Sequence, residues 1–156
     1  MKRSFCKLLI LSNFLVFMTG HALFSSNIDS LKALTEAASP EKKVKLFIQL
    51  SEEYYSDSLS LSMEYAREAL NIAEQINDRK AESDALCQIG NVYYYLYKPE
   101  KALEIFSECL DIKQKINDEK GLSKVLNYIG VVYYDMPNYD SAKKYFTHSY
   151  DIAKES

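Results

Sequence analysis

Hydrophobic residues recur along the chain with the spacing of amphipathic helices, and the helical stretches come in pairs. Leu86, Ile89 and Tyr93 stand at positions i, i+3 and i+7, which places them on one face of a helix. Prolines at positions 40, 99 and 137 divide the pattern, and a proline fits the first turn of a helix but not its interior. The sequence therefore predicts an all-α chain of about seven helices in antiparallel hairpins.

The hydrophobic pattern repeats after forty residues. One copy has Leu86, Ile89, Gly90, Tyr93, Ala102 and Phe106, and the next has Leu126, Ile129, Gly130, Tyr133, Ala142 and Phe146. A degenerate copy precedes them and has Leu50 in place of the glycine. Repeats of this length are typical of solenoids, in which each unit buries its apolar faces against its neighbours. We expect one repeat domain over residues 23–156, with a degenerate repeat at about 40–78 and regular repeats at about 79–118 and 119–156.

Gly90 and Gly130 lie inside predicted helices, where glycine is destabilising by about 1 kcal/mol relative to alanine. A packing reason is therefore expected at both positions. Ala102 and Ala142, at matching places in the following helices, are small enough to let those helices approach the glycines closely. The sequence predicts helical hairpins that each have one tightly packed seam.

The first 22 residues have the pattern of a secretory signal peptide. A basic start with Lys2, Arg3 and Lys7 precedes an apolar run from Leu8 to Met18, and small residues follow. The run is shorter than the roughly 20 apolar residues of a spanning helix. We expect cleavage after Ala22, export to the periplasm and no stable membrane insertion afterwards; the alternative is an uncleaved anchor. Removing the three basic residues takes the net charge from −3 to −6, which argues against a nucleic-acid partner.

Motifs for catalysis, metal binding or cofactor binding are missing from the rest of the sequence. It has no glycine-rich phosphate loop and no nucleophile motif, and His148 is its only histidine. Acidic residues such as Glu104 and Glu108 fall at helical spacing among lysines such as Lys113, which is the pattern of a solvated helix face. We therefore predict no enzyme, no cofactor and no metal site.

Cys87 and Cys109 lie on adjoining predicted helices of one hairpin. Export would permit a disulfide between them. The interpretation favoured by the sequence is that both are small buried apolar side chains, because cysteine often serves as one and Cys109 stands where the repeat has a small core residue.

The repeated order of large apolar residue, Ile-Gly, Tyr, Ala and Phe resembles the tetratricopeptide repeat family. The resemblance implies a right-handed superhelical solenoid that binds a protein or peptide in its concave groove. The forty-residue copies, the exported start and the recurring Ile-Asn-Asp also resemble the periplasmic sensor regions of Bacteroidetes-type histidine kinases and response regulators. That narrower resemblance implies a sensory input region of a signalling protein as the alternative function.

In the family, ligands lie along the inner surface formed by the first helix of each hairpin. Tyr54, Tyr94 and Tyr134 follow the core position by one residue, which rotates them by about 100° toward that surface and predicts a tyrosine ladder. The groove residues implied by the resemblance are Tyr54, Asn91, Tyr94, Tyr95, Lys124, Asn127 and Tyr134.

The last predicted helix carries more apolar residues than one partner helix can cover. Tyr145, Phe146, Tyr150 and Ile152 all lie between positions 139 and 154. Terminal repeats of solenoids normally have a polar outer face. We expect either that this end associates with a second copy of the chain or that the sequence belongs to a longer array. A frayed terminus that tolerates exposure is the alternative.

Overall fold

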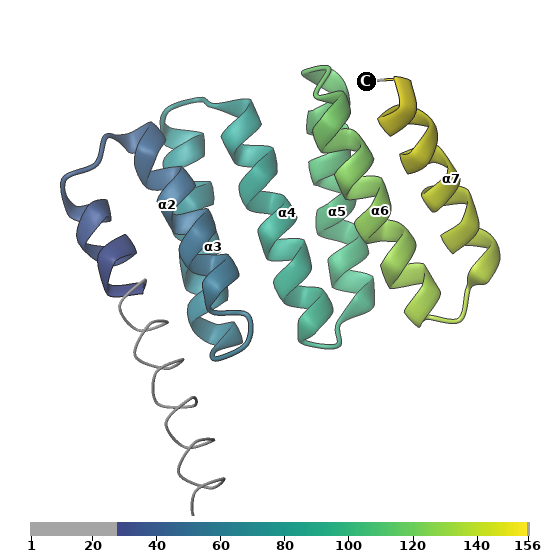
Figure 1. Cartoon of the computed structure of the whole chain (residues 1–156), viewed down its shortest axis with the longest axis horizontal. Helices are drawn as coiled ribbons and strands as arrows, with labels where there is room; N and C mark the ends of the chain where they lie inside the picture. The colour runs from purple at the N-terminus through teal and green to yellow at the C-terminus, as the bar shows by residue number, and fades with distance from the viewer. Residues whose placement is uncertain (1–27, 156) are drawn as a thin grey trace, which may run out of the picture. The chain divides into compact units, whose positions relative to one another are not determined.

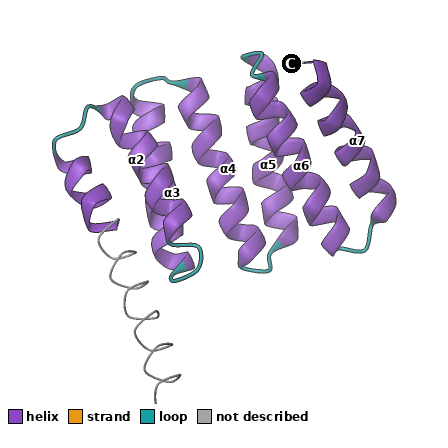
Figure 2. Cartoon of the chain, viewed as in Figure 1, coloured by secondary structure: helices purple, strands orange, loops and turns teal. Residues whose placement is uncertain are grey.

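The computed structural model describes residues 28–155, and over this range it contains helices and connecting loops but no strand (Figure 2). One helix covers residues 28–36. The six helices that follow are α2 (Pro40–Glu53), α3 (Leu59–Gln75), α4 (Arg79–Tyr95), α5 (Pro99–Lys115), α6 (Glu119–Asp135) and α7 (Tyr139–Glu155) (Figure 1). The prediction of an all-α chain with seven helices is confirmed. The predicted signal peptide, residues 1–22, lies outside the described residues.

The chain divides into two compact units, one ending at Ala37 and the other beginning at Ala38. The second unit holds the repeats, as three hairpins α2–α3, α4–α5 and α6–α7 in which each helix packs on the next (Figure 1). None of the helices between residues 28 and 155 has both the length and the apolar character needed to cross a bilayer. The predicted domain boundaries and the predicted export remain predictions.

Short turns of one kind join most of these helices. Asn77 and Asn117 take positive φ values of 55° and 54°, and the next residue donates its N–H back into the helix, as Asp78 does to Ala73 O at 3.0 Å. This is a Schellman ending, for which asparagine is well suited. Asp78 then caps the following helix, because its side chain accepts from the Ala81 N–H at 3.0 Å. One Asn-Asp pair thus ends one helix and starts the next.

The two glycines lie under phenylalanine rings. A Cβ atom on Gly90 would stand 2.5 Å from Cε1 of Phe106, and one on Gly130 would stand 2.6 Å from Cε1 of Phe146. Ala102 is buried in the same seam, but the nearest atoms to Gly90 belong to the ring. The predicted packing reason is confirmed, while its partner is corrected: the glycines admit a large ring from the next helix.

Helix α7 packs on α6 and leaves large apolar side chains in solvent. Tyr145 stacks on Tyr133 with ring centroids 5.5 Å apart, and Ala142 is buried. Tyr139 and Tyr150 are exposed. Association of this end with a second copy stays a prediction.

Candidate functional site

Three adjoining cavities follow the inner helices α2, α4 and α6. The first, about 360 Å³, lies among the N-terminal halves of α4 and α6 and the facing side of α2. The second, about 270 Å³, shares Tyr128 with the first, and the third, about 610 Å³, shares Tyr94, Tyr95 and Val132 with the second. Because neighbouring cavities share walls, they form one continuous surface, which we call the inner groove.

Five of the seven sequence-predicted binding residues line this groove. Asn91, Tyr94, Tyr95 and Asn127 surround the middle cavity, and Lys124 lines the first. On α4 the lining positions follow one helix face, because residues 84, 88, 91 and 95 are three or four apart. The structure therefore brings these five residues together on adjacent inner helices.

Tyr54 and Tyr134 lie elsewhere. Helix α2 ends at Glu53, two residues before the position equivalent to the end of α4, so Tyr54 enters the turn. Its ring stacks on Tyr65 of α3 at 5.6 Å and is only 9% exposed. Tyr134 is 58% exposed and meets Tyr139 edge to face at 5.5 Å, and it is not among the lining residues of the three cavities described above. The predicted ladder of residues 54, 94 and 134 is thus corrected.

The aromatic row that crosses the inner helices is shifted by one residue from the predicted ladder. Tyr55 of α2 lies against Tyr95 of α4 with centroids 5.1 Å apart, and Tyr95 meets Tyr94 edge to face at 5.4 Å. Tyr55 and Tyr95 are forty residues apart, so the repeat period contained the signal for this contact, and the next position in the period is Asp135. The forty-residue period did not reveal that α2 ends two residues early.

A hydrogen-bonded group at the α2–α4 wall was not predicted. Tyr55 Oη donates to Gln88 Oε1, and Gln88 Nε2 donates to Glu52 Oε1 at 2.7 Å. Burial raises the pKa of Tyr55 far above its usual range, so this phenol stays protonated as a donor. The side chains on this wall are therefore held in place before any ligand binds.

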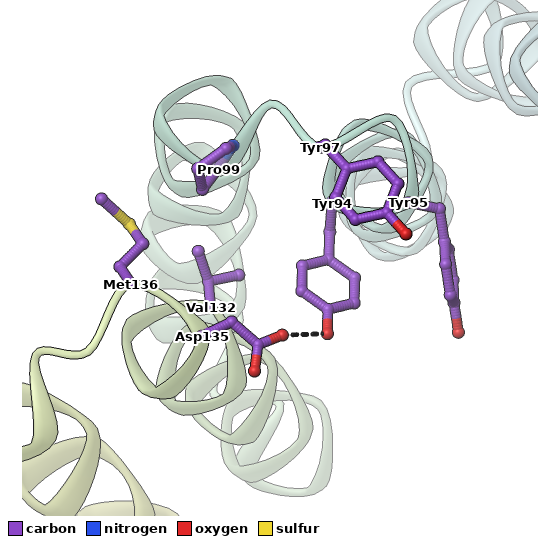
Figure 3. Close-up of a pocket in the computed structure, with 7 residues that line it drawn as sticks. All are labelled: Tyr94, Tyr95, Tyr97, Pro99, Val132, Asp135 and Met136. Atoms are coloured by element: carbon purple, nitrogen blue, oxygen red, sulfur yellow. Dashed lines mark hydrogen bonds between the residues drawn. The ribbon is translucent and has the colours of Figure 1, made fainter.

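Tyr94 bridges α4 and α6 at the other end of the groove (Figure 3). Its Oη donates to Asp135 Oδ2 at 2.5 Å, and in Figure 3 the ring points from α4 directly at that carboxylate. The hydrogen bond to Asp135 is the main cause that raises the pKa of Tyr94 to about 12. Asp135 therefore keeps a protonated phenol beside it throughout the neutral range.

Lys113 is buried where the second and third hairpins meet. It is 3% exposed and donates to Asp84 Oδ1 at 2.6 Å and to Asp118 Oδ2 at 3.1 Å, while Lys80 donates to Asp118 Oδ2 at 2.8 Å. Burial by itself raises the pKa of Asp118, but the bonds from both lysines and from the Gly121 N–H outweigh it and lower the pKa to about 2. The prediction that Lys113 lies on a solvated face is wrong: its aliphatic stem enters the junction and its ammonium group is paired there.

Cys87 and Cys109 form a disulfide between α4 and α5, with their Cα atoms 5.9 Å apart. The interpretation of two separate buried thiols is therefore corrected. Both side chains face the seam of the second hairpin, where the glycine at position 90 lets the helices come close, and this spacing is within the usual range for a bridge. Cys87 also lines the first cavity of the groove.

The comparisons with known proteins agree with this geometry. The family model for the tetratricopeptide repeat matches residues 83–155. No curated protein sequence matches the chain. Among solved structures, the tetratricopeptide domain of Arabidopsis FLU is 14% identical, with a TM-score of 0.67 over 76% of this chain and all of that domain.

Two larger proteins have the same fold over most of this chain. A STAND signal-transduction ATPase of Pyrococcus horikoshii with a tetratricopeptide repeat sensor is 25% identical, with a TM-score of 0.74 over 90% of this chain and 22% of its own length. A Rap protein complexed with competence and sporulation factor is 22% identical, with a TM-score of 0.75 over 90% of this chain and 41% of its own length. The sequence match identifies residues 83–155 as tetratricopeptide repeats, and the solved structures show that most of the chain has the same fold.

Proposed function

We propose that this chain is an exported, non-catalytic interaction module that binds an extended peptide or a protein segment in the inner groove. The observation that carries the proposal is the continuity of the groove, whose three cavities share walls along α2, α4 and α6. Its walls combine rigid aromatic rings with amide and charged groups. Such rings lose little entropy on binding and are common at binding hot spots.

Asn91 and Asn127 supply the polar contacts in this proposal. They occupy nearly equivalent faces of α4 and α6 and line the same middle cavity. A carboxamide offers both a donor and an acceptor, which matches the alternating N–H and C=O groups of an extended backbone. We infer that these two residues bind the main chain of the ligand, while the cavities on either side receive its side chains.

Known proteins of this fold support a role in recognition. The Rap protein was solved in a complex with competence and sporulation factor, and the archaeal ATPase carries its tetratricopeptide repeats as a sensor. The disulfide between Cys87 and Cys109 supports export, because disulfides persist in oxidising compartments.

The sensor precedent favours a second candidate function, in which the chain is the input region of a signalling protein. A transmembrane helix or kinase domain encoded in the same reading frame directly after Ser156 would favour this candidate. A stop codon there, together with peptide binding by the chain itself, would favour the independent module.

The groove can be tested with a displayed library of random peptides selected on the full chain. Peptides that bind should lose affinity by about tenfold or more when Asn91 and Asn127 are both changed to Ala, because two backbone contacts are removed. The matched control is Glu108→Ala on the exposed face of α5. Failure to select any peptide, or equal losses in both variants, would contradict the proposal.

A further inference from the structure

The third cavity of the groove has an unusual wall. Its rings are those of Tyr94, Tyr95 and Tyr97, and Val132 and Met136 complete an apolar side (Figure 3). Asp135 is the only ionisable carboxylate among its lining residues, and no lysine or arginine of the described chain is among them. We call this cavity the tyrosine pocket.

The one formal charge among the lining residues of the tyrosine pocket is the negative charge of Asp135. The pocket lies where α4 and α6 end and where α5 begins at Pro99, so it receives the partial negative charge of two helix ends and the partial positive charge of one helix start. Neither helix has a basic residue in its last turn, whereas the last turn of α5 has Lys113 and Lys115. Asp135, the last residue of α6, adds a full charge at the same place.

The turn between α4 and α5 does not require a tyrosine at position 97. Its φ is 55°, the conformation that Asn77 and Asn117 adopt in equivalent turns, and a bulky residue is uncommon there. Its ring is 93% exposed, so packing does not compensate for the strained backbone. A strained backbone conformation that is not compensated by packing of the side chain is typical of functional positions. Tyr97 is nevertheless one of the residues that line the cavity, and Figure 3 draws its ring over the end of α4.

The opposite end of the groove carries charges of both signs. The first cavity lies at the N-terminal halves of α4 and α6 and is lined by three lysines and two carboxylates: Lys45, Lys113, Lys124, Glu52 and Asp84. Lys124 already covers the ring of Tyr128, with its Nζ 5.8 Å from the centroid. Of these two cavities, only the tyrosine pocket has a carboxylate in its lining with no lysine or arginine beside it among the lining residues.

We propose that the tyrosine pocket receives a basic side chain, lysine or arginine, from the peptide bound in the inner groove. The cation lies against the tyrosine faces, whose negative quadrupole attracts it, and pairs with the carboxylate of Asp135. The Tyr94 hydroxyl holds that carboxylate through Oδ2 and orients it toward the cavity. This inference rests on the proposed function, because the peptide is what presents the side chain.

The pocket can be tested without knowing the peptide. The full chain, with its tyrosines labelled with ¹³C, is titrated by NMR with methylguanidinium and with N-methylurea, a neutral molecule of nearly the same shape. Methylguanidinium should shift the ring signals of Tyr94 and Tyr97 and bind about tenfold more tightly than the urea. Equal binding of the two probes would overturn the proposal.

Two variants locate the binding. Asp135→Asn keeps an acceptor for Tyr94 but removes the charge, so methylguanidinium binding should fall about tenfold. Tyr97→Asn installs the residue that other turns use, so folding is preserved or improved, and binding should fall about threefold through loss of one ring. Asp57→Asn, at the equivalent turn of the first hairpin, is the control and should leave binding unchanged. Unchanged binding in both Asp135→Asn and Tyr97→Asn would overturn the assignment.

The peptide selection separates this inference from the proposed function. Enrichment of lysine or arginine at one position, lost when the library is selected on Asp135→Asn, supports both. Peptides that bind through Asn91 and Asn127 with no basic preference would leave the groove function standing and overturn the tyrosine pocket. If no peptide is selected at all, the proposed function fails, and the methylguanidinium titration still decides whether the pocket recognises cations.

Discussion

The first and second hairpins fill the same seam in opposite ways. In α4–α5 the inner helix contributes Gly90 and the outer helix contributes Phe106, whose ring lies over the glycine. In α2–α3 the positions forty residues earlier are Leu50 and Ala66, so the large residue is on the inner helix and the small one on the outer helix. All three side chains, Leu50, Ala66 and Phe106, are almost completely buried.

This exchange shows that the packing between the two helices requires a certain total side-chain volume at the two positions. It does not require a particular residue at either one. A well-packed interior tolerates hydrophobic substitutions when the total volume is kept. The glycine of the regular repeats is therefore one half of a pair. The first hairpin lacks this glycine because its large residue is on the inner helix and its small residue on the outer helix, and the contact between the helices is still filled.

The largest expected effect comes from changing only one residue of the Gly90–Phe106 pair in the second hairpin to its counterpart in the first hairpin. Gly90→Leu should lower the free energy of unfolding by about 3 kcal/mol, because even a Cβ atom would overlap the Phe106 ring. Phe106→Ala should cost about 3–5 kcal/mol through the cavity it leaves. The double variant recreates the Leu-Ala pair of the first hairpin and should be more stable than either single variant. Urea unfolding followed by circular dichroism measures all three.

The stability losses of independent sites add. If the double variant loses as much free energy of unfolding as the two single variants together, the two positions do not compensate for each other and the comparison is wrong. Leu110→Val on α5 is a control for general core sensitivity, since this residue lies beside the same cluster but is not a member of the pair. Combined with Gly90→Leu it should show no rescue.

The third hairpin sharpens the comparison, because it repeats the Gly-Phe pair at the end of the described chain. Phe146 is only half-buried, whereas Phe106 is 1% exposed. The Phe146 ring can therefore move toward solvent when Gly130 is enlarged. Gly130→Leu should cost about 1–2 kcal/mol, less than Gly90→Leu, in the same unfolding experiment. Equal losses would show that α7 is held as firmly as α5.

The sequence was sufficient for the fold and for much of the groove. The forty-residue period and helical spacing identified the hairpins, and the positions of Asn91, Tyr94 and Asn127 followed from the repeat. Tyr54 was misplaced because the end of α2 depends on how residues 54–58 turn, which side-chain periodicity does not encode. Lys113 was missed because a lysine on a helix is usually solvated, and only the packing of α4 and α6 around it shows two carboxylates facing its ammonium group.

The junction between the first and second hairpins and the junction between the second and third hairpins differ in charge. Lys113 lies at the second of these junctions, and the equivalent residue at the first is the fully buried Ala73. Asp118→Asn keeps the helix cap on the Gly121 N–H but removes the partner charge, and should cost about 1.5 kcal/mol at neutral pH. Asp78→Asn, which changes the same cap at the Ala73 junction, should cost much less.

The loss should also depend on pH. The pKa of Asp118 is about 2 in the folded chain against an ordinary value of 3.8. A lowered folded-state pKa gives stability that is complete above pH 4 and lost as the pH falls toward 2. The difference between wild type and Asp118→Asn in urea unfolding should therefore shrink over this range. A difference that stays constant from pH 5 to pH 2 would contradict the ion-pair assignment.

The smallest expected effect concerns one tyrosine position that the three hairpins use differently. Tyr54 stacks on Tyr65, Tyr94 donates to Asp135 of the next inner helix, and Tyr134 is exposed. Tyr94→Phe removes a hydrogen bond to a carboxylate at a solvent-accessible site and should cost about 0.5–1 kcal/mol, while Tyr134→Phe should cost almost nothing. Because the hydrogen bond raises the pKa of Tyr94 to about 12, the stabilisation is present below pH 10 and is lost as the pH rises toward 12. Unfolding at pH 8 and pH 11 measures both effects, and a Tyr94→Phe loss that does not shrink at the higher pH would show that the hydroxyl does not link α4 to α6 in this way.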